Sequence, residues 1–211
     1  MQQRVLLAGT VLSPGARGEA LSREARRLLS QLAAELGFDC PQPLWSPRGS
    51  GPPTHPALPA SWYAGITHKR EQVIVGLSDR PFGIDLEYSN TRHAKRLHGL
   101  IELLPDYPVQ HAILHADCPQ QAFYQAWTLH EALFKLHSQT EHPVNSVLDT
   151  RLHSILSKKH HTGLWQSPQW TFAITACAPL TLPVNPSRIL PGVEPTELLF
   201  AATQQPRSRS R

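Results

Sequence analysis

Cysteine is scarce in this sequence of 211 residues, and its placement argues against a disulfide framework. The three cysteines are Cys40, Cys118 and Cys177. Their number is odd, they lie far apart, and no Cys-x-x-Cys spacing occurs. This pattern is typical of free, buried thiols in a reducing compartment. We therefore expect three reduced cysteines that pack as small apolar side chains.

Long apolar runs are also missing. The first fifteen residues, MQQRVLLAGTVLSPG, contain an apolar run too short for a transmembrane helix and lack the layout of a signal peptide. We expect a cytoplasmic protein with no membrane partner. Charged residues make up only 17% of the chain, but the 40% hydrophobic content is that of a globular protein. The net charge of +4 only weakly suggests an anionic partner.

The apolar pattern predicts both helices and strands. Apolar residues recur every three or four positions in residues 19–36, 91–104 and 120–137, which predicts three helices. Strand-like segments follow one another at residues 5–12, 62–66, 72–77 and 82–87, and another alternating segment covers 170–176. Short turns join the strands of the first part, so we expect an antiparallel sheet there. Residues 144–156 look mixed, with possible short strands.

The segment Phe-Gly-Ile-Asp-Leu-Glu at residues 82–87 carries the first chemical signal. Side chains alternate faces along a strand, so Asp85 and Glu87 share one face while Ile84 and Leu86 share the other. Two carboxylates this close repel each other unless a cation lies between them. Oxygen ligands suit a hard ion such as Mg²⁺. The alternative is a strand end whose carboxylates are simply solvated.

A second signal lies on the helix at residues 120–137. Glu131 and Lys135 are separated by one turn and share a face, which in isolation is typical of an exposed ion pair. His130 beside Glu131 invites comparison with zinc proteases. Their motif needs a second histidine at position 134, where this chain has Phe134, so that interpretation fails.

Three segments taken together resemble a known family. Residues 65–68 read Gly-Ile-Thr-His, residues 83–87 read Gly-Ile-Asp-Leu-Glu, and residues 127–135 read Trp-Thr-Leu-His-Glu-Ala-Leu-Phe-Lys. Their order and spacing resemble the Ser/Thr-His, Gly-Ile-Asp-x-Glu and Trp-Ser/Thr-x-Lys-Glu-x-x-x-Lys motifs of the 4′-phosphopantetheinyl transferases. The similarity is to the larger, pseudo-dimeric class that activates siderophore and surfactin synthetases. It spans about residues 17–178.

The resemblance implies a fold and a domain organisation. It implies an α+β monomer of two similar halves, residues 1–90 and 91–185, each with a helix packed on a small antiparallel sheet. The active site would lie in the cleft between the halves. Residues 186–211 are expected to form a disordered tail, because the apolar pattern fades and the end is rich in Gln, Arg and Ser.

The resemblance also implies a reaction and its residues. Such enzymes transfer 4′-phosphopantetheine from coenzyme A to a serine of an apo acyl or peptidyl carrier protein and release 3′,5′-ADP, in fatty-acid, polyketide or nonribosomal-peptide biosynthesis. Carried over by motif, the Mg²⁺ ligands are Asp85, Glu87 and Glu131, and the catalytic residues are Glu131 as the base and Lys135. The expected coenzyme A contacts are Thr67, His68, Lys135 and, by approximate position, Arg17.

Two departures from the family pattern leave alternatives open. His130 stands where the family usually has lysine, and the loop Arg-Gly-Ser-Gly-Pro-Pro at residues 48–53 is longer than usual. His130 could help to hold a phosphate as the pH falls, or it could point away from the cleft as a tolerated surface substitution. A catalytically weak or inactive relative that binds coenzyme A or carrier protein is the main alternative. A nucleic-acid binder using the Arg-rich tail at residues 207–211 and the basic pI has no other support.

Overall fold

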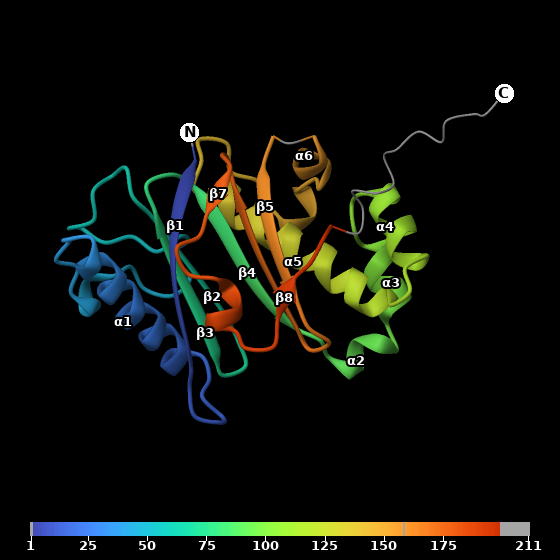
Figure 1. Cartoon of the computed structure of the whole chain (residues 1–211), viewed down its shortest axis with the longest axis horizontal. Coiled ribbons are helices and arrows are strands. Elements are labelled where there is room, and N and C mark those ends of the chain that lie inside the picture. Colours follow the sequence, from blue (N-terminus) through green and yellow to red (C-terminus); the bar gives the residue numbers. More distant parts are fainter. Residues whose placement is uncertain (1, 158, 199–211) are drawn as a thin grey trace.

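Two four-stranded sheets form the centre of the molecule (Figure 1). The structure is a computed structural model and describes residues 2–157 and 159–198. In the first sheet the strand order is β2 (Tyr63–Lys69), β3 (Gln72–Ser78), β1 (Gln3–Val11) and β7 (Leu180–Thr181). In the second it is β4 (Phe82–Tyr88), β6 (Trp170–Ala176), β5 (His161–Gln166) and β8 (Glu194–Pro195). Among these strands only the β1–β7 pair is parallel, and all the other pairs are antiparallel. Mainly antiparallel sheets together with helices make an α+β fold, so the expected class is confirmed.

Each sheet carries one long helix. Helix α1 (Glu19–Glu35) packs on β1 and β3, and helix α5 (Pro119–His137) packs on β4 and β6. The shorter helices are α2 (Thr91–Ala94), α3 (Leu97–Glu102), α4 (Tyr107–Leu114), α6 (His153–Leu156) and α7 (Pro186–Ile189), with 3₁₀ turns η1 (Gln42–Leu44) and η2 (Val147–Asp149). The helix expected over residues 91–104 is thus split in two. The short strands considered for residues 144–156 are wrong, since η2 and α6 occupy this segment.

Strand β4 belongs to the second sheet, although residue 90 was expected to close the first half. It pairs with β6, so that Asp85 lies opposite Ala173 and Glu87 opposite Thr171. Its other side meets β2, where the backbone N–H of Leu86 donates a hydrogen bond to Thr67 Oγ1 at 3.0 Å. The carboxylate-bearing strand therefore lies at the junction of the two sheets rather than at the end of the first.

Strand β3 is buried at every position. One face, with Val73, Val75 and Leu77, packs in the cluster formed with α1. The other face, with Ile74, joins a central cluster that includes Phe82 and residues from both sheets. A pattern of alternating apolar residues does not show whether a second layer covers the opposite face.

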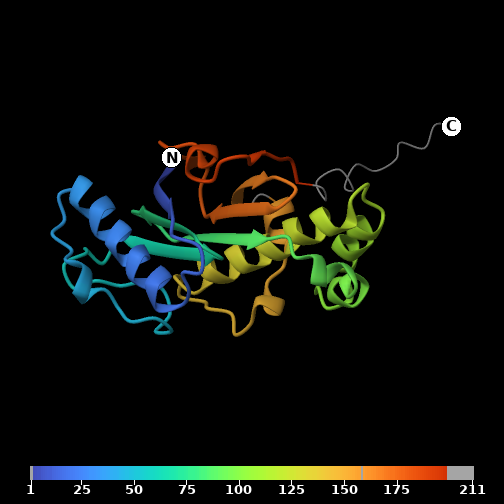
Figure 2. The ribbon, with the colours of Figure 1, turned by 90° about the horizontal axis from the view of Figure 1, so that it is seen from below.

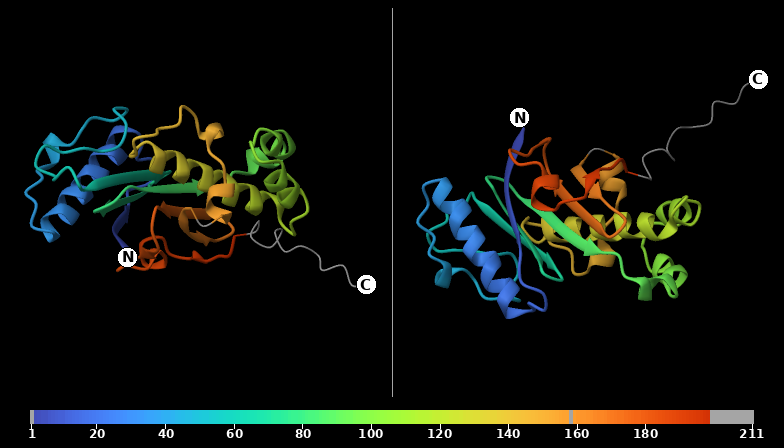
Figure 3. Two further views of the ribbon diagram at one scale, coloured as in Figure 1. Left: turned by 90° about the horizontal axis from the view of Figure 1, so that it is seen from above. Right: turned by 60° about the horizontal axis from the view of Figure 1, so that its bottom comes forward.

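The C-terminal segment crosses the strands on the side opposite α5, as Figures 2 and 3 show in red. Leu190 and Val193 are buried in the central cluster, and Gln72 Nε2 donates a hydrogen bond to the carbonyl of Ile189 at 3.2 Å. The prediction of a disordered tail from residue 186 is therefore wrong for α7 and β8. Residues 199–211, including the Arg/Ser-rich end, lie outside the described residues.

The structure also bears on the expected lack of a membrane helix and on the three cysteines. Within residues 2–157 and 159–198, no helix combines the length and the apolar character needed to cross a bilayer. The three cysteines are free, as expected. Only Cys40 is buried, however, while Cys118 and Cys177 are exposed, so the prediction that all three pack as buried apolar side chains is wrong.

Gly83 sets the distance between β4 and α5. A Cβ added at this glycine would overlap the carbonyl oxygen of Ala132 and would lie 2.7 Å from the backbone nitrogen of Leu136. Both atoms belong to the backbone of α5, so neither can move aside as a flexible side chain could. Glycine is needed here because the backbone of a helix passes directly over the strand.

We expect Gly83→Ala to lower the free energy of unfolding by about 3 kcal/mol or more, because the new methyl group must push α5 off the sheet. Gly99→Ala is the matched control, since a Cβ there meets no atom within 4 Å and lies in helix α3, where alanine is favoured by about 0.5–1 kcal/mol. Urea unfolding of the three proteins measures both effects. Equal stability of Gly83→Ala and the unmodified protein would rule out the close approach.

Candidate active site

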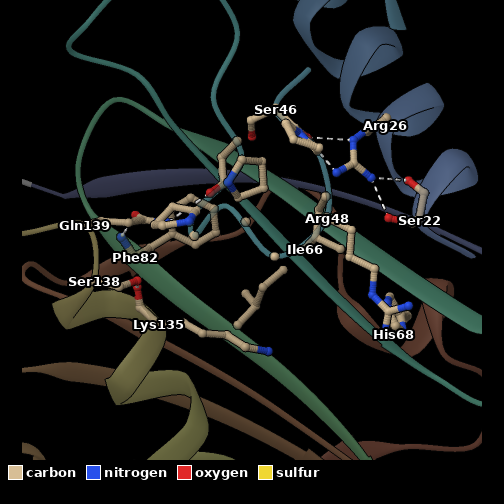
Figure 4. Close-up of a pocket in the computed structure, with 18 of the residues that line it drawn as sticks. Ser22, Arg26, Ser46, Arg48, Ile66, His68, Phe82, Lys135, Ser138 and Gln139 are labelled. Atoms are coloured by element: carbon tan, nitrogen blue, oxygen red, sulfur yellow. Dashed lines mark hydrogen bonds between the residues drawn. The ribbon is translucent and has the colours of Figure 1, made fainter. Parts of the chain in front are cut away.

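A pocket of about 390 Å³ opens between the two halves of the chain. Its walls come from α1, the loop at residues 46–53, β2, the start of β4 and the C-terminal part of α5. Four basic side chains line it: Arg26, Arg48, His68 and Lys135 (Figure 4). Figure 4 shows the guanidinium group of Arg48 beside the ring of His68, with Lys135 reaching in from α5. These four side chains suit an anionic ligand, while most of the remaining lining is apolar.

His68 lies in this pocket, as expected from its motif. Burial lowers the pKa of its imidazole, and the positive charges of Arg48 and Lys135 lower that pKa further. The ring is therefore neutral at neutral pH and can donate one hydrogen bond. A bound anion would offset the two neighbouring charges and raise the pKa again.

Arg26 holds the pocket loop onto α1. Its Nε and Nη2 donate hydrogen bonds to the carbonyl of Ser46 at 2.9 and 2.6 Å, and its Nη1 donates to the carbonyl of Ser22 at 2.9 Å. Arg17, the expected phosphate contact, is not among the residues that line the pocket. The helix pattern in the sequence does not show which arginine on or just before α1 faces the loop at residues 46–53, so it does not distinguish Arg26 from Arg17.

Asp85 is buried, with 5% of its surface exposed, at the point where α5 crosses β4. Its Oδ1 accepts hydrogen bonds from Lys135 Nζ at 2.6 Å and from Thr67 Oγ1 at 3.3 Å. Thr67 Oγ1 also accepts a hydrogen bond from the backbone N–H of Leu86, so Thr67 links β2 to β4. Thr67 is not among the residues that line the pocket. The other oxygen, Asp85 Oδ2, is buried and has no partner among the described residues.

Glu87 and Glu131 lie close enough to Asp85 for its negative charge to affect their pKa values. Lys69 Nζ lies 2.6 Å from Glu87 Oε2. Burial raises the pKa of Glu87, and the charge of Asp85 raises it further, although Lys69 opposes the shift. The pKa of Glu131 is raised by the same two causes in the same order. The structure therefore brings together the three carboxylates that the sequence singled out.

The donor atoms of these carboxylates suit a hard cation, but in this structure the three side chains are not arranged as a metal site. All their donors are oxygens, and the unpartnered Asp85 Oδ2 could accept a ligand bond. In the part of the chain that the structure describes, no group of three or more His, Cys, Asp or Glu side chains is arranged to hold a metal ion. Lys135 and Lys69 neutralise two of the three carboxylates instead.

A second pocket, of about 420 Å³, lies beyond the same carboxylates. Lys69, Glu87 and Glu131 line one part of it, and apolar residues of α3, α5 and η2 line the rest: Leu100, Leu103, Phe123, Trp127 and Leu148. Helix α5 runs along both pockets, with Phe134 and Lys135 at the first and residues 123–131 at the second. Sequence analysis did not find this pocket, because α3 and η2 are distant in sequence.

His130 faces the interior, away from Glu131. It is fully buried, and its Nδ1 lies 2.7 Å from Thr150 Oγ1, which donates a hydrogen bond to the carbonyl of Val147 at 2.6 Å. Burial lowers the pKa of His130 to about 4. Of the two alternatives, the structure bears out that His130 points away from the cleft, so it does not hold a phosphate, but the side chain is buried and is not a surface substitution. The side chain holds the segment around η2 against α5.

No protein-family model matches the chain, and no curated protein matches it. The geometry of the two pockets and of the carboxylates between them therefore carries the functional inference.

We expect the free energy of unfolding to fall as the pH drops from 6.5 to about 4, by on the order of 3 kcal/mol from His130 alone. The unfolded chain binds a proton at this histidine in that range, whereas the folded chain does not. Urea unfolding at several pH values should show a smaller decline for His130→Leu than for the unmodified protein. His142→Leu, at an exposed histidine, should keep the full decline. The same decline in His130→Leu would contradict the assignment.

Proposed function

We propose that this protein is a 4′-phosphopantetheinyl transferase, which moves phosphopantetheine from coenzyme A to a serine of an apo acyl or peptidyl carrier protein. One observation carries the proposal: a pocket lined by basic side chains adjoins, at the Lys135–Asp85 contact of 2.6 Å, three carboxylates that influence one another's pKa values. A pyrophosphate with a divalent cation needs both kinds of group at adjacent positions. The three motifs that the sequence shares with the family supply most of these residues.

The basic pocket would bind the 3′,5′-ADP part of coenzyme A. Arg48 offers a planar, permanently charged group for a phosphate, and Lys135 offers a point charge beside Asp85. His68, neutral and within the electrostatic influence of both cations, would donate a hydrogen bond to a phosphate oxygen. Arg26 would act indirectly, because its hydrogen bonds to Ser46 and Ser22 hold the loop that closes the pocket.

Asp85, Glu87 and Glu131 would hold a Mg²⁺ ion, which neutralises charge on the pyrophosphate when it is bound. In the free protein Lys135 and Lys69 balance the charges of Asp85 and Glu87. As the substrate arrives, Lys135 would turn from Asp85 to a phosphate oxygen. The ligand set would therefore be completed only together with the substrate's pyrophosphate.

The acceptor serine would enter through the second pocket. The attacking and leaving oxygens lie roughly in line in phosphoryl transfer, and the two pockets lie along α5 with the carboxylates between them. Glu131 would accept the serine proton as the general base. The Oγ–H bond breaks, an Oγ–P bond forms, and the P–O bond to 3′,5′-ADP breaks.

A protein that binds coenzyme A without turning it over is the second candidate. The observation that favours it is the pairing of two of the three carboxylates with lysines, which leaves no ready group of three metal ligands in the described part of the chain. A turnover assay separates the two candidates.

The test is incubation with coenzyme A, Mg²⁺ and a panel of apo acyl and peptidyl carrier proteins, read out by intact mass. We expect one or more carriers to gain a phosphopantetheine group. Glu131→Gln and Asp85→Asn should lower the rate by about 10²–10⁴-fold, as expected for loss of a base or a charge at the reacting group. Glu102→Gln, at an exposed glutamate on α3, is the matched control and should keep full activity.

Two outcomes would contradict these assignments. Coenzyme A binding without modification of any carrier would favour the non-catalytic candidate. A rate for Asp85→Asn close to that of the unmodified protein at saturating Mg²⁺ would show that Asp85 is not part of the reacting centre.

A further inference from the structure

His93 lines the second pocket together with Glu87 and Glu131, and the proposed reaction does not yet use it. Its Nδ1 lies 2.7 Å from the hydroxyl oxygen of Tyr124. The same hydroxyl oxygen accepts a hydrogen bond from the backbone N–H of Asn90 at 2.8 Å. Tyr124 is on α5 and is almost completely buried, so the ring of His93 is anchored to the long helix.

The hydrogen bonds of Tyr124 decide which nitrogen of His93 carries the proton. A backbone N–H can only donate, so the hydroxyl oxygen must accept from Asn90. Among the described residues, the proton of the Tyr124 hydroxyl has one recorded acceptor, His93 Nδ1. A buried hydroxyl without an acceptor is unfavourable, so Nδ1 accepts and carries no proton. In the neutral ring the proton then sits on Nε2, which is the nitrogen left to meet a ligand.

We infer that His93 is a positioning residue for the acceptor serine, an inference that rests on the proposed function. Its Nε2–H donates a hydrogen bond to the attacking hydroxyl oxygen. A hydroxyl group has one proton and two lone pairs. One lone pair accepts from His93, the second attacks phosphorus, and the proton points to Glu131, which takes it as the Oγ–P bond forms and 3′,5′-ADP leaves.

Two other polar groups on this wall have partners of their own. The ammonium group of Lys69 is paired with Glu87 at 2.6 Å, and the hydroxyl proton of Tyr124 is given to His93.

Replacing His93 with an amide side chain can show which of its two ring nitrogens matters. The amide nitrogen of glutamine reaches about as far as Nε2, whereas that of asparagine reaches only about as far as Nδ1. His93→Gln therefore keeps the donor and no longer needs Tyr124, and His93→Asn loses the donor.

The first test needs no substrate. A long-range ¹H–¹⁵N correlation spectrum of the full-length protein distinguishes the two neutral tautomers, and the signal that disappears in His93→Gln identifies His93. We expect the Nε2–H tautomer in the unmodified protein and a shift towards Nδ1–H in Tyr124→Phe. An Nδ1–H tautomer in the unmodified protein would overturn the inference.

The second test is kinetic. We expect His93→Asn to lower kcat with carrier protein by on the order of 10²-fold, with an unchanged affinity for coenzyme A, because only the alignment of the hydroxyl is lost. His93→Gln should recover most of this loss. Tyr124→Phe should slow the otherwise unmodified enzyme but have little further effect in the His93→Gln background. A purely structural role of Tyr124 would slow both backgrounds equally.

The outcomes separate the two proposals. Turnover by the unmodified protein with an unchanged rate in His93→Asn would overturn the positioning role and leave the proposed function intact. Absence of turnover by the unmodified protein with every carrier would overturn the proposed function, and with it the role of His93, whatever tautomer the spectrum shows.

Discussion

The contact between helix α5 and strand β4 at Gly83 determines the rest of the site. Because no side chain separates the two backbones there, α5 lies close enough for Lys135 to reach Asp85 at 2.6 Å. One turn earlier along the same helix, Glu131 joins the field of Asp85 and Glu87. The helix then continues along the second pocket, where Tyr124 anchors His93. A single close packing contact thus places the basic pocket, the carboxylates and the second pocket along one element.

Charge balance explains how this arrangement can be stable before a substrate binds. Three carboxylates in one field would repel one another, and two lysines compensate for this at Asp85 and Glu87. Glu131 has no such ion pair within the described residues, and burial together with Asp85 raises its pKa. The lysine contacts are ion pairs that an anionic substrate and a divalent cation could replace. The same groups that stabilise the free protein would then neutralise the pyrophosphate.

Sequence patterns predicted the parts of the site that depend on local periodicity. Strand alternation placed Asp85 and Glu87 on one face, and helical spacing placed Glu131 and Lys135 together. Patterns could not show which element covers a face, so they do not show that β4 belongs to the second sheet or that Asp85 is buried where α5 crosses it. The inward direction of His130 depends on Thr150, and the roles of Arg26 and Arg48 depend on the fold of a Pro/Gly-rich loop without periodicity. These contacts join residues far apart in sequence, which local spacing does not report.

The central claim is that the basic pocket binds the phosphates of coenzyme A. Isothermal titration of the full chain with coenzyme A, 3′,5′-ADP and pantetheine, each with Mg²⁺ and at two salt concentrations, tests it most directly. The account predicts that coenzyme A and 3′,5′-ADP bind, that both bind more weakly at the higher salt concentration, and that pantetheine does not bind. Binding of pantetheine with the affinity of coenzyme A, or no binding of coenzyme A, would contradict it.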